Sequence, residues 1–229
     1  MHSLIKLCNV AFMILPLIST SVAAAQPGGI TVGGTRVIFN GNKKETSLSV
    51  TNSDANPYLI QSWAETQAGA TDKAPFIITP PLFRMEGNQQ TQLRIVRTGT
   101  LPEDRESLYW INVKSIPSGT PKEGVNTLQI AIKTRIKLIF RPQNLKGNAE
   151  EVTEQITWHK QGNKLTVNNP TPFVMNFHRV TVGGKEVKDA TYVLPMSSDT
   201  YTMPAAASGP ISWKLINDYG GIGVQHTAR

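Results

Sequence analysis

The chain contains 229 residues, with 23 Lys and Arg against 16 Asp and Glu, so its formal net charge is +7. A basic protein can bind nucleic acid, anionic lipid or acidic protein groups. The basic residues are scattered along the chain, whereas contacts to nucleic-acid phosphates need clustered Lys and Arg. The composition therefore argues against nucleic acid as a partner.

The first 25 residues have the pattern of a secretory signal peptide. Lys6 precedes an apolar run over residues 7–18, and Ala23-Ala24-Ala25 supplies the small residues for cleavage before Gln26. The apolar run is shorter than the ~20 residues that a membrane-spanning helix needs. We therefore expect export of a mature protein that begins at Gln26, with a net charge of 22 − 16 = +6 because Lys6 is removed.

Short β-rich runs bounded by Gly, Pro, Asn and Asp recur along the remaining chain, whereas helical periodicity is hard to find. Those before residue 142 are Arg36–Phe39, Thr46–Thr51, Tyr58–Glu65, Phe76–Thr79, Gln92–Arg97, Leu108–Lys114 and Thr127–Phe140. Those after it are Ile156–His159, Lys164–Val167, Val174–Val182, Thr191–Leu194, Thr200–Met203 and Ile211–Ile216. Such spacing predicts an all-β fold of two β-sandwich domains. The polar segment 143–148 separates them, which gives domains over 26–147 and 148–229.

The most informative segment is the alternating stretch from Leu128 to Pro142. Leu128, Ile130 and Ile132 share one face of an extended chain because strand side chains repeat every two residues. A central strand would bury such a stripe in its own core, whereas an edge strand would offer it to another protein. Alternation by itself favours the core, and the pattern leaves both interpretations open.

Residues typical of enzyme active sites are few. Cys8 is the only cysteine and lies within the signal peptide, so disulfides, thiol chemistry and cysteine-type zinc sites are not expected in the mature chain. His159, His178 and His226 lie in separate segments, and neither G-x-S-x-G, H-E-x-x-H nor a Gly-rich phosphate loop occurs. The sequence predicts a protein that is not an enzyme and that uses no metal or cofactor.

Seven local motifs, in the same order, resemble those of the PapD-like periplasmic pilus chaperones, over essentially the whole mature chain. The motifs are Thr35–Phe39, Pro57–Trp63, Thr79-Pro80-Pro81, Leu101–Trp110, Leu128–Pro142, Asn169–Phe173 and Ile216–Gly221. The resemblance implies two immunoglobulin-like domains set at an angle, with a cleft between them. It also implies a periplasmic protein that caps pilus subunits by donor-strand complementation and delivers them to an outer-membrane usher. The short polar loop at 117–126 resembles that of the short-loop subgroup.

The resemblance also assigns roles to particular residues. They are Leu128, Ile130 and Ile132 in the donor strand, Arg36 and Lys137 at the C-terminal carboxylate of the subunit, and Glu106, Arg141 and Asp218 in a salt-bridge network that joins the domains. Thr79-Pro80 matches a position where the family has a cis peptide. These roles are expectations from the resemblance, because surface charges and core strands show the same patterns.

Three questions stay open at this level. Ile132 and Lys137 differ by an odd number of residues, so a regular strand points them to opposite faces. Either a bulge lies between them or the two faces of the strand border different partners. An exposed donor strand could also lead the free chaperone to cap itself in a homo-oligomer. The alternative that the chain is a pilus subunit or an adhesive sandwich protein is disfavoured, because Gln26–Thr35 is Gly-rich and only weakly alternating.

Overall fold

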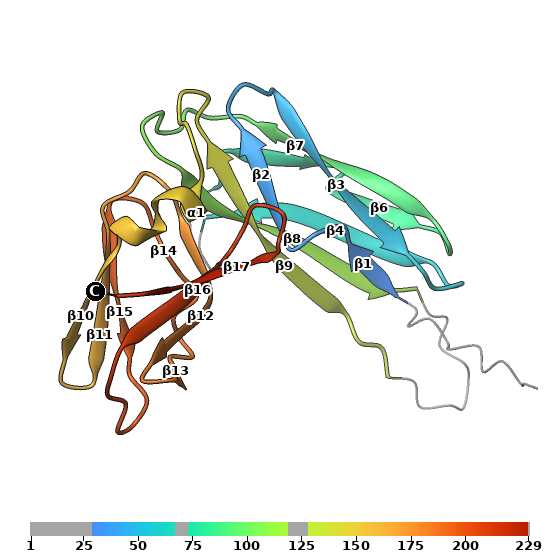
Figure 1. The fold of residues 1–229 in the computed structure, drawn as a ribbon. Helices are drawn as coiled ribbons and strands as arrows, with labels where there is room; N and C mark the ends of the chain where they lie inside the picture. Colours follow the sequence, from blue (N-terminus) through green and yellow to red (C-terminus); the bar gives the residue numbers. More distant parts are fainter. Residues whose placement is uncertain (1–28, 67–72, 119–127, 229) are drawn as a thin grey trace, which may run out of the picture.

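The computed structural model describes residues 29–66, 73–118 and 128–228, and nearly all of their regular structure is β-strand. Figure 1 shows two sandwiches that meet at an angle, so that the molecule is bent. The prediction of an all-β fold with two sandwiches is confirmed. The expected signal peptide at 1–25 lies outside the described residues, as does most of the loop at 117–126.

The first sandwich pairs two sheets, in the strand orders β1-β3-β7-β5 and β2-β9-β8-β4-β6. Its strands are β1 (Ile30–Val32), β2 (Arg36–Asn40), β3 (Glu45–Asn52), β4 (Tyr58–Glu65), β5 (Phe76–Thr79), β6 (Leu82–Met85), β7 (Gln90–Arg97), β8 (Ser107–Pro117) and β9 (Ile132–Arg141). Alternate residues of these strands fill one buried cluster that includes Phe39, Ile60, Leu93, Ile111 and Phe140. The peptide bond between Thr79 and Pro80 is cis, as the family resemblance implied.

The first strand region changes sheets between β1 and β2. β1 pairs with β3 in one sheet, whereas β2 pairs in parallel with β9 in the other. The crossing occurs at Gly33 and Gly34. A Cβ at Gly33 would lie 1.8 Å from Oγ of Ser49, and Gly34 has φ +131°, which side-chain-bearing residues rarely adopt. Because of this crossing, β2 pairs with β9 and β1 does not.

The second sandwich has sheets in the orders β10-β11-β15 and β13-β12-β16-β17, with β14 paired to β12. Its strands are β10 (Thr157–Gln161), β11 (Lys164–Asn169), β12 (Met175–Val182), β13 (Lys185–Glu186), β14 (Tyr192–Val193), β15 (Ser197–Thr202), β16 (Ile211–Ile216) and β17 (Ile222–Thr227). Its core is a separate cluster that includes Leu165, Phe173, Met175, Trp213 and Leu215. Each sandwich therefore has its own hydrophobic core.

The sequence patterns did not predict several short elements. They are β1, β6, β13, β17, the helix α1 (Ala149–Val152) and the 3-10 turn η1 (Thr153–Gln155). α1 follows the expected linker and is capped by Asn148, whose side chain accepts hydrogen bonds from the backbone N–H groups of Glu150 and Glu151. One helical turn is too short to show a 3.6-residue period. No helix in the described part of the chain is long and apolar enough to cross a membrane.

Candidate functional site

The alternating segment is a strand only in part, which corrects the expectation of a strand from Thr127 to Phe140. β9 begins at Ile132, and residues 128–131 belong to no strand. β8 runs beside β9 only as far as the pair Ser115 and Ile132, and β2 joins β9 only from Lys137 onward. Among the described strands, none pairs with this segment before Ile132.

The apolar stripe of this segment is exposed to solvent. Leu128 is 84% exposed, Ile130 63% and Ile132 61%. Further along β9, Ile136, Leu138 and Phe140 are buried in the core of the first sandwich. The stripe is therefore an extension of the core-facing side of β9 beyond the domain. The interpretation of these three residues as an ordinary core strand is wrong for the chain by itself, and large exposed apolar side chains in one row mark an interaction surface.

The two sides of β9 border different surroundings. The register between β8 and β9 is regular from Ser107–Phe140 to Ser115–Ile132, so no bulge lies between Ile132 and Lys137. Ile132 therefore lies on the side that continues the core, whereas Lys137 lies on the opposite side, toward the second sandwich. Of the two explanations that the sequence left open, the strand with two different faces is the one found.

One edge of β9 is open along half its length. β8 covers one edge of the strand from Ile132 to Phe140, but β2 covers the other edge only from Lys137 to Arg141. Residues 132–136 thus present an unpaired edge among the described strands, and this edge ends where β2 begins, at Arg36. An unpaired strand edge is a template for addition of a further strand.

Arg36 and Lys137 lie side by side at the end of this open edge. They are paired in register across the parallel strands β2 and β9, so their side chains leave the sheet on the same side. Nη1 of Arg36 donates to the carbonyl oxygen of Ile216 at 3.3 Å, and Nζ of Lys137 donates to Oδ1 of Asn176 at 2.6 Å. Both acceptors are neutral and belong to the second sandwich. Nε of Arg36 is buried without a hydrogen-bond partner in the described part of the chain.

The surroundings lower the pKa of both residues. Burial and, as the smaller cause, the neighbouring Arg36 together lower the pKa of Lys137 to about 8. Burial also lowers the pKa of Arg36, although Asp218 opposes that shift. The ring of Tyr192 lies 4.6 Å from Nζ of Lys137, and that of Trp110 lies 5.9 Å from it. Two half-buried cations with neutral neighbours form a site that an anion would stabilise.

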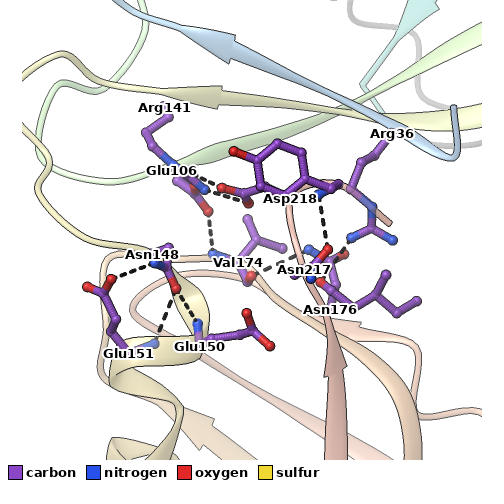
Figure 2. Close-up of polar contacts among 12 residues, drawn as sticks. Arg36, Glu106, Arg141, Asn148, Glu150, Glu151, Val174, Asn176, Asn217 and Asp218 are labelled. Carbon is purple, nitrogen blue, oxygen red and sulfur yellow. Dashed lines mark hydrogen bonds and ion pairs between the residues drawn. The ribbon is translucent and has the colours of Figure 1, made fainter. Parts of the chain in front are cut away.

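A second polar cluster connects the two sandwiches. Figure 2 shows Arg141, at the end of β9, between the carboxylates of Glu106 and Asp218. Nε of Arg141 donates to Glu106 at 2.7 Å, and its two terminal nitrogens donate to Asp218 at 2.6 and 2.9 Å. The other oxygen of Glu106 accepts from the backbone N–H of Val174 at 2.8 Å. The first sandwich supplies Glu106 and Arg141, and the second supplies Asp218 and Val174.

This cluster is largely shielded from water. Glu106 is only 3% exposed, and its burial raises its pKa while Arg141 works to lower it. Burial also acts to lower the pKa of Arg141, but the hydrogen bonds and charges of Asp218 and Glu106 outweigh it and raise that pKa. A cavity of about 110 Å³ lies beside the cluster, lined also by Ile139 and Ile216. The bidentate geometry holds the sandwiches in a defined contact, as suits a planar guanidinium.

Comparison with known proteins agrees with this architecture. Residues 29–146 match the family model for the pili and flagellar-assembly chaperone, PapD N-terminal domain. Residues 151–227 match the model for the pili assembly chaperone PapD, C-terminal domain. The chain belongs to the PapD family of pilus-assembly chaperones. The alternative that it is a pilus subunit is thereby rejected.

Individual members of the PapD family resemble the chain over most of its length. The probable fimbrial chaperone LpfB of Escherichia coli O157:H7 is 43% identical over 225 residues, which cover 96% of this chain and 95% of LpfB. A structure of the Salmonella enterica SafA pilin in complex with the SafB chaperone matches at 42% identity with a TM-score of 0.82, covering 89% of this chain and 97% of that one. The structure of the E. coli chaperone DraB matches at 43% identity with a TM-score of 0.78, and the match covers 88% of this chain and 96% of DraB.

Sequence reasoning missed several residues that surround Arg36 and Lys137. Asn176 on β12 accepts from Lys137, and the backbone carbonyl of Ile216 accepts from Arg36. The rings of Trp110 and Tyr192 meet edge to face across the two sandwiches, with their centroids 6.2 Å apart. No signal in a single sequence marks these residues, because an asparagine or a tyrosine in a strand has no distinctive spacing. Only the contact between the sandwiches brings them to the basic pair.

Proposed function

We propose that this chain is a periplasmic chaperone that binds pilus subunits, caps them by donor-strand complementation and passes them to an outer-membrane usher. The subunit would add a strand along the open edge of β9 and accept the side chains of Leu128, Ile130 and Ile132 into its own groove. Arg36 and Lys137 would hold the C-terminal carboxylate of the subunit. The exposed stripe, the open edge and the basic pair each support one part of this proposal.

The observation that carries the proposal is the way the open edge ends. A strand added beside residues 132–136 would pair with the same edge of β9 as β2 does. β2 begins at Arg36 and runs parallel to β9. If the added strand also runs parallel to β9, its C-terminal end meets Arg36 and Lys137. A chain that ended there would place its carboxylate between two cations. If the added strand ran antiparallel to β9, its N-terminal end would meet Arg36 and Lys137 instead. A terminal ammonium group there would be repelled by the two cations.

Two interactions of different kinds would contribute to binding. Burying three large apolar side chains contributes on the order of 5–9 kcal/mol gross, reduced by the costs of association. A carboxylate between a guanidinium and an ammonium forms short, charge-assisted hydrogen bonds. Losing one partner of such a desolvated pair costs ~2–5 kcal/mol. The stripe thus provides most of the affinity, and the basic pair fixes the register of the added strand.

The other parts of the proposal follow from the same surfaces. An exported chaperone acts in the periplasm, where subunits meet the usher before assembly. Release of the subunit requires that a strand of another subunit replaces residues 128–136. When no subunit is present, the exposed stripe provides a surface by which two copies of the chain could cap each other. Sedimentation of the purified protein, with Ile130→Ser as the comparison, tests for such a homo-oligomer.

The test of the proposed function is recovery of subunits from the periplasm. The wild type and the double variant Arg36→Ala/Lys137→Ala are each expressed with the neighbouring genes, purified and analysed by mass spectrometry for bound proteins. Arg84→Ala/Lys188→Ala is the matched control, because it removes two positive charges from exposed positions. We expect a pilin-like protein with the wild type and the control but not with the cleft variant. Equal recovery with all three would refute carboxylate anchoring.

A further inference from the structure

The ammonium group of Lys137 is held by one strong contact in the free protein. Its Nζ donates to Oδ1 of Asn176 at 2.6 Å, and Asn176 is only 4% exposed. The amide nitrogen of Asn176 lies 3.4 Å from the carbonyl oxygen of Val174, which orients the amide so that its oxygen faces Lys137. Asn176 lies on β12 of the second sandwich, and Figure 2 labels it together with Val174 and Asn217.

The groups that face Lys137 from the surrounding elements are neutral or positive. Tyr192 on β14 and Trp110 on β8 present their rings, and Arg36 on β2 presents a second cation. Asp218, which follows β16, acts on Arg36 and pairs with Arg141. No carboxylate of the described residues forms an ion pair with Lys137. The amide of Asn176 is therefore its strongest acceptor within the described chain.

We propose that Asn176 is a positioning residue that holds the ammonium group of Lys137 in place in the free chaperone and gives it up to the carboxylate of an incoming subunit. This inference rests on the proposed function, because it concerns the same carboxylate site. A neutral amide suits this task for two reasons. It satisfies a half-buried ammonium hydrogen-bond donor, and it leaves the positive charge of Lys137 without a permanent counter-ion.

Two substitutions at this position separate these effects. In Asn176→Asp, a carboxylate of nearly the same shape forms an internal ion pair with Lys137 and competes with the subunit. In Asn176→Leu, the ammonium group loses its acceptor while burial stays. The first change raises the pKa of Lys137 and the second lowers it, because an anion favours the charged form and desolvation disfavours it. A residue that only supported the fold would shift neither pKa nor peptide affinity in this pattern.

The experiment measures the pKa of the Lys137 ammonium group by NMR and the affinity of a synthetic peptide by calorimetry between pH 6 and 9. The peptide copies the C-terminal strand of the subunit that co-purifies with the wild type, and is made with a free carboxylate and with a C-terminal amide. Asn163→Asp is the matched control, because it adds the same charge at an exposed position of the same domain. Thermal unfolding establishes that each variant is folded. Because the pKa is measured without any peptide, it provides a readout that does not depend on binding.

We expect Asn176→Asp to raise the pKa of Lys137 and to weaken the free-carboxylate peptide by at least about 30-fold. Binding of the amidated peptide should not change. Asn176→Leu should move the upper pH limit of carboxylate binding downward, and Asn163→Asp should leave pKa and affinity at wild-type values. If Asn176→Leu does not fold, the isosteric Asn176→Asp still decides the matter.

A wild-type pKa for Lys137 and wild-type peptide affinity in Asn176→Asp would overturn the inference. Arg36→Ala and Lys137→Ala, measured with the same peptides, separate this failure from that of the proposed function. If those two variants lose the free-carboxylate peptide while Asn176→Asp does not, only the role of Asn176 is wrong. If neither of them affects binding, carboxylate anchoring is wrong as well.

Discussion

Arg36 of β2 and Lys137 of β9 are paired directly across two parallel strands, so two cations leave the same side of the sheet as neighbours. Each is half-buried, and the charge of Arg36 adds to burial in lowering the pKa of Lys137. Their acceptors in the described chain, a backbone carbonyl and an amide, are neutral. Within the described chain, neither cation is hydrogen-bonded to a carboxylate at the point where the open edge of β9 ends.

Binding of a subunit carboxylate should weaken with rising pH. Lys137 has a pKa of about 8 in the free chain, lowered first by burial and then by Arg36. Below that pH the ammonium group is charged and affinity is constant. Above it, each carboxylate must bind together with a proton, so the dissociation constant should rise up to about tenfold per pH unit. Calorimetry of the free-carboxylate peptide from pH 6 to pH 10 measures this.

Lys137→Arg is the control for the pH effect, because a guanidinium stays charged throughout this range. A pH profile as steep in Lys137→Arg as in the wild type would contradict the prediction. The free energy of unfolding of the free wild type should instead increase with rising pH. Since the folded pKa lies below the unfolded value of 10.5, the unfolded chain binds more protons between about pH 8 and 10.5, and folding becomes more favourable with pH in that window.

Replacing Arg36 should change Lys137 measurably. In Arg36→Gln the neighbouring positive charge is removed, so the pKa of Lys137 should rise toward its ordinary value while burial still holds it below that value. Peptide affinity should nevertheless fall, because the guanidinium contact to the carboxylate is lost. An NMR titration of Lys137 beside calorimetry separates the two effects. An unchanged Lys137 pKa in this variant would show that the two cations do not interact.

The exposed stripe of Leu128, Ile130 and Ile132 should matter for binding and little for the fold of the free chain. Ile130 is 63% exposed, so Ile130→Ser removes few native contacts and should change the free energy of unfolding by less than about 0.5 kcal/mol. Recovery of the subunit should fall, since the side chain would be buried only in the complex. Ile136→Ser is the contrasting variant, because Ile136 is 8% exposed and lies in the core. We expect denaturant unfolding to distinguish them. A strongly destabilised Ile130→Ser would mean that the stripe packs on the free protein.

The cluster around Arg141 should contribute to stability because it provides hydrogen-bond partners for buried polar groups. Glu106 accepts from Arg141 with one oxygen and from the Val174 N–H with the other. In Glu106→Gln one oxygen becomes an N–H₂ group, which faces a donor and leaves a buried donor without an acceptor. The expected loss is about 1–3 kcal/mol in the free energy of unfolding. Denaturant unfolding measures it.

Asp218→Asn is the comparison for that variant. The side chain of Asp218 is 31% exposed, so water can replace part of the interaction with Arg141 that the substitution removes. The expected destabilisation is therefore smaller than that of Glu106→Gln. Because Asp218 is the carboxylate from the second sandwich, this variant should instead broaden the distribution of angles between the sandwiches. Small-angle scattering of the two variants tests this. A larger stability loss in Asp218→Asn than in Glu106→Gln would contradict the assignment of Glu106 as the more buried group.

Local pattern was sufficient for most of the strands and for the shared face of Leu128, Ile130 and Ile132, but it did not show whether that face is buried or exposed. The strand at Tyr58–Glu65 was predicted with its observed bounds, because its alternation and the turn residues around it are encoded within a few positions. The start of β9 was placed too early, since nothing local to Leu128 shows that β8 and β2 lie elsewhere. β1 was missed because three residues carry too little periodicity, and β6 was missed because only Pro80 and Pro81 separate it from β5.

The sequence by itself determined that the chain is built from short strands, that its first residues have the pattern of a secretory signal peptide and that Leu128, Ile130 and Ile132 share a face. These properties depend on neighbouring residues, so they can be recognised along the chain. Only the tertiary structure decided that the stripe projects beyond its own core, that Arg36 lies beside Lys137 and that Asn176 contacts Lys137. These relationships depend on contacts between residues far apart in the chain, which the packing of two sandwiches and the crossing at Gly33 and Gly34 bring together.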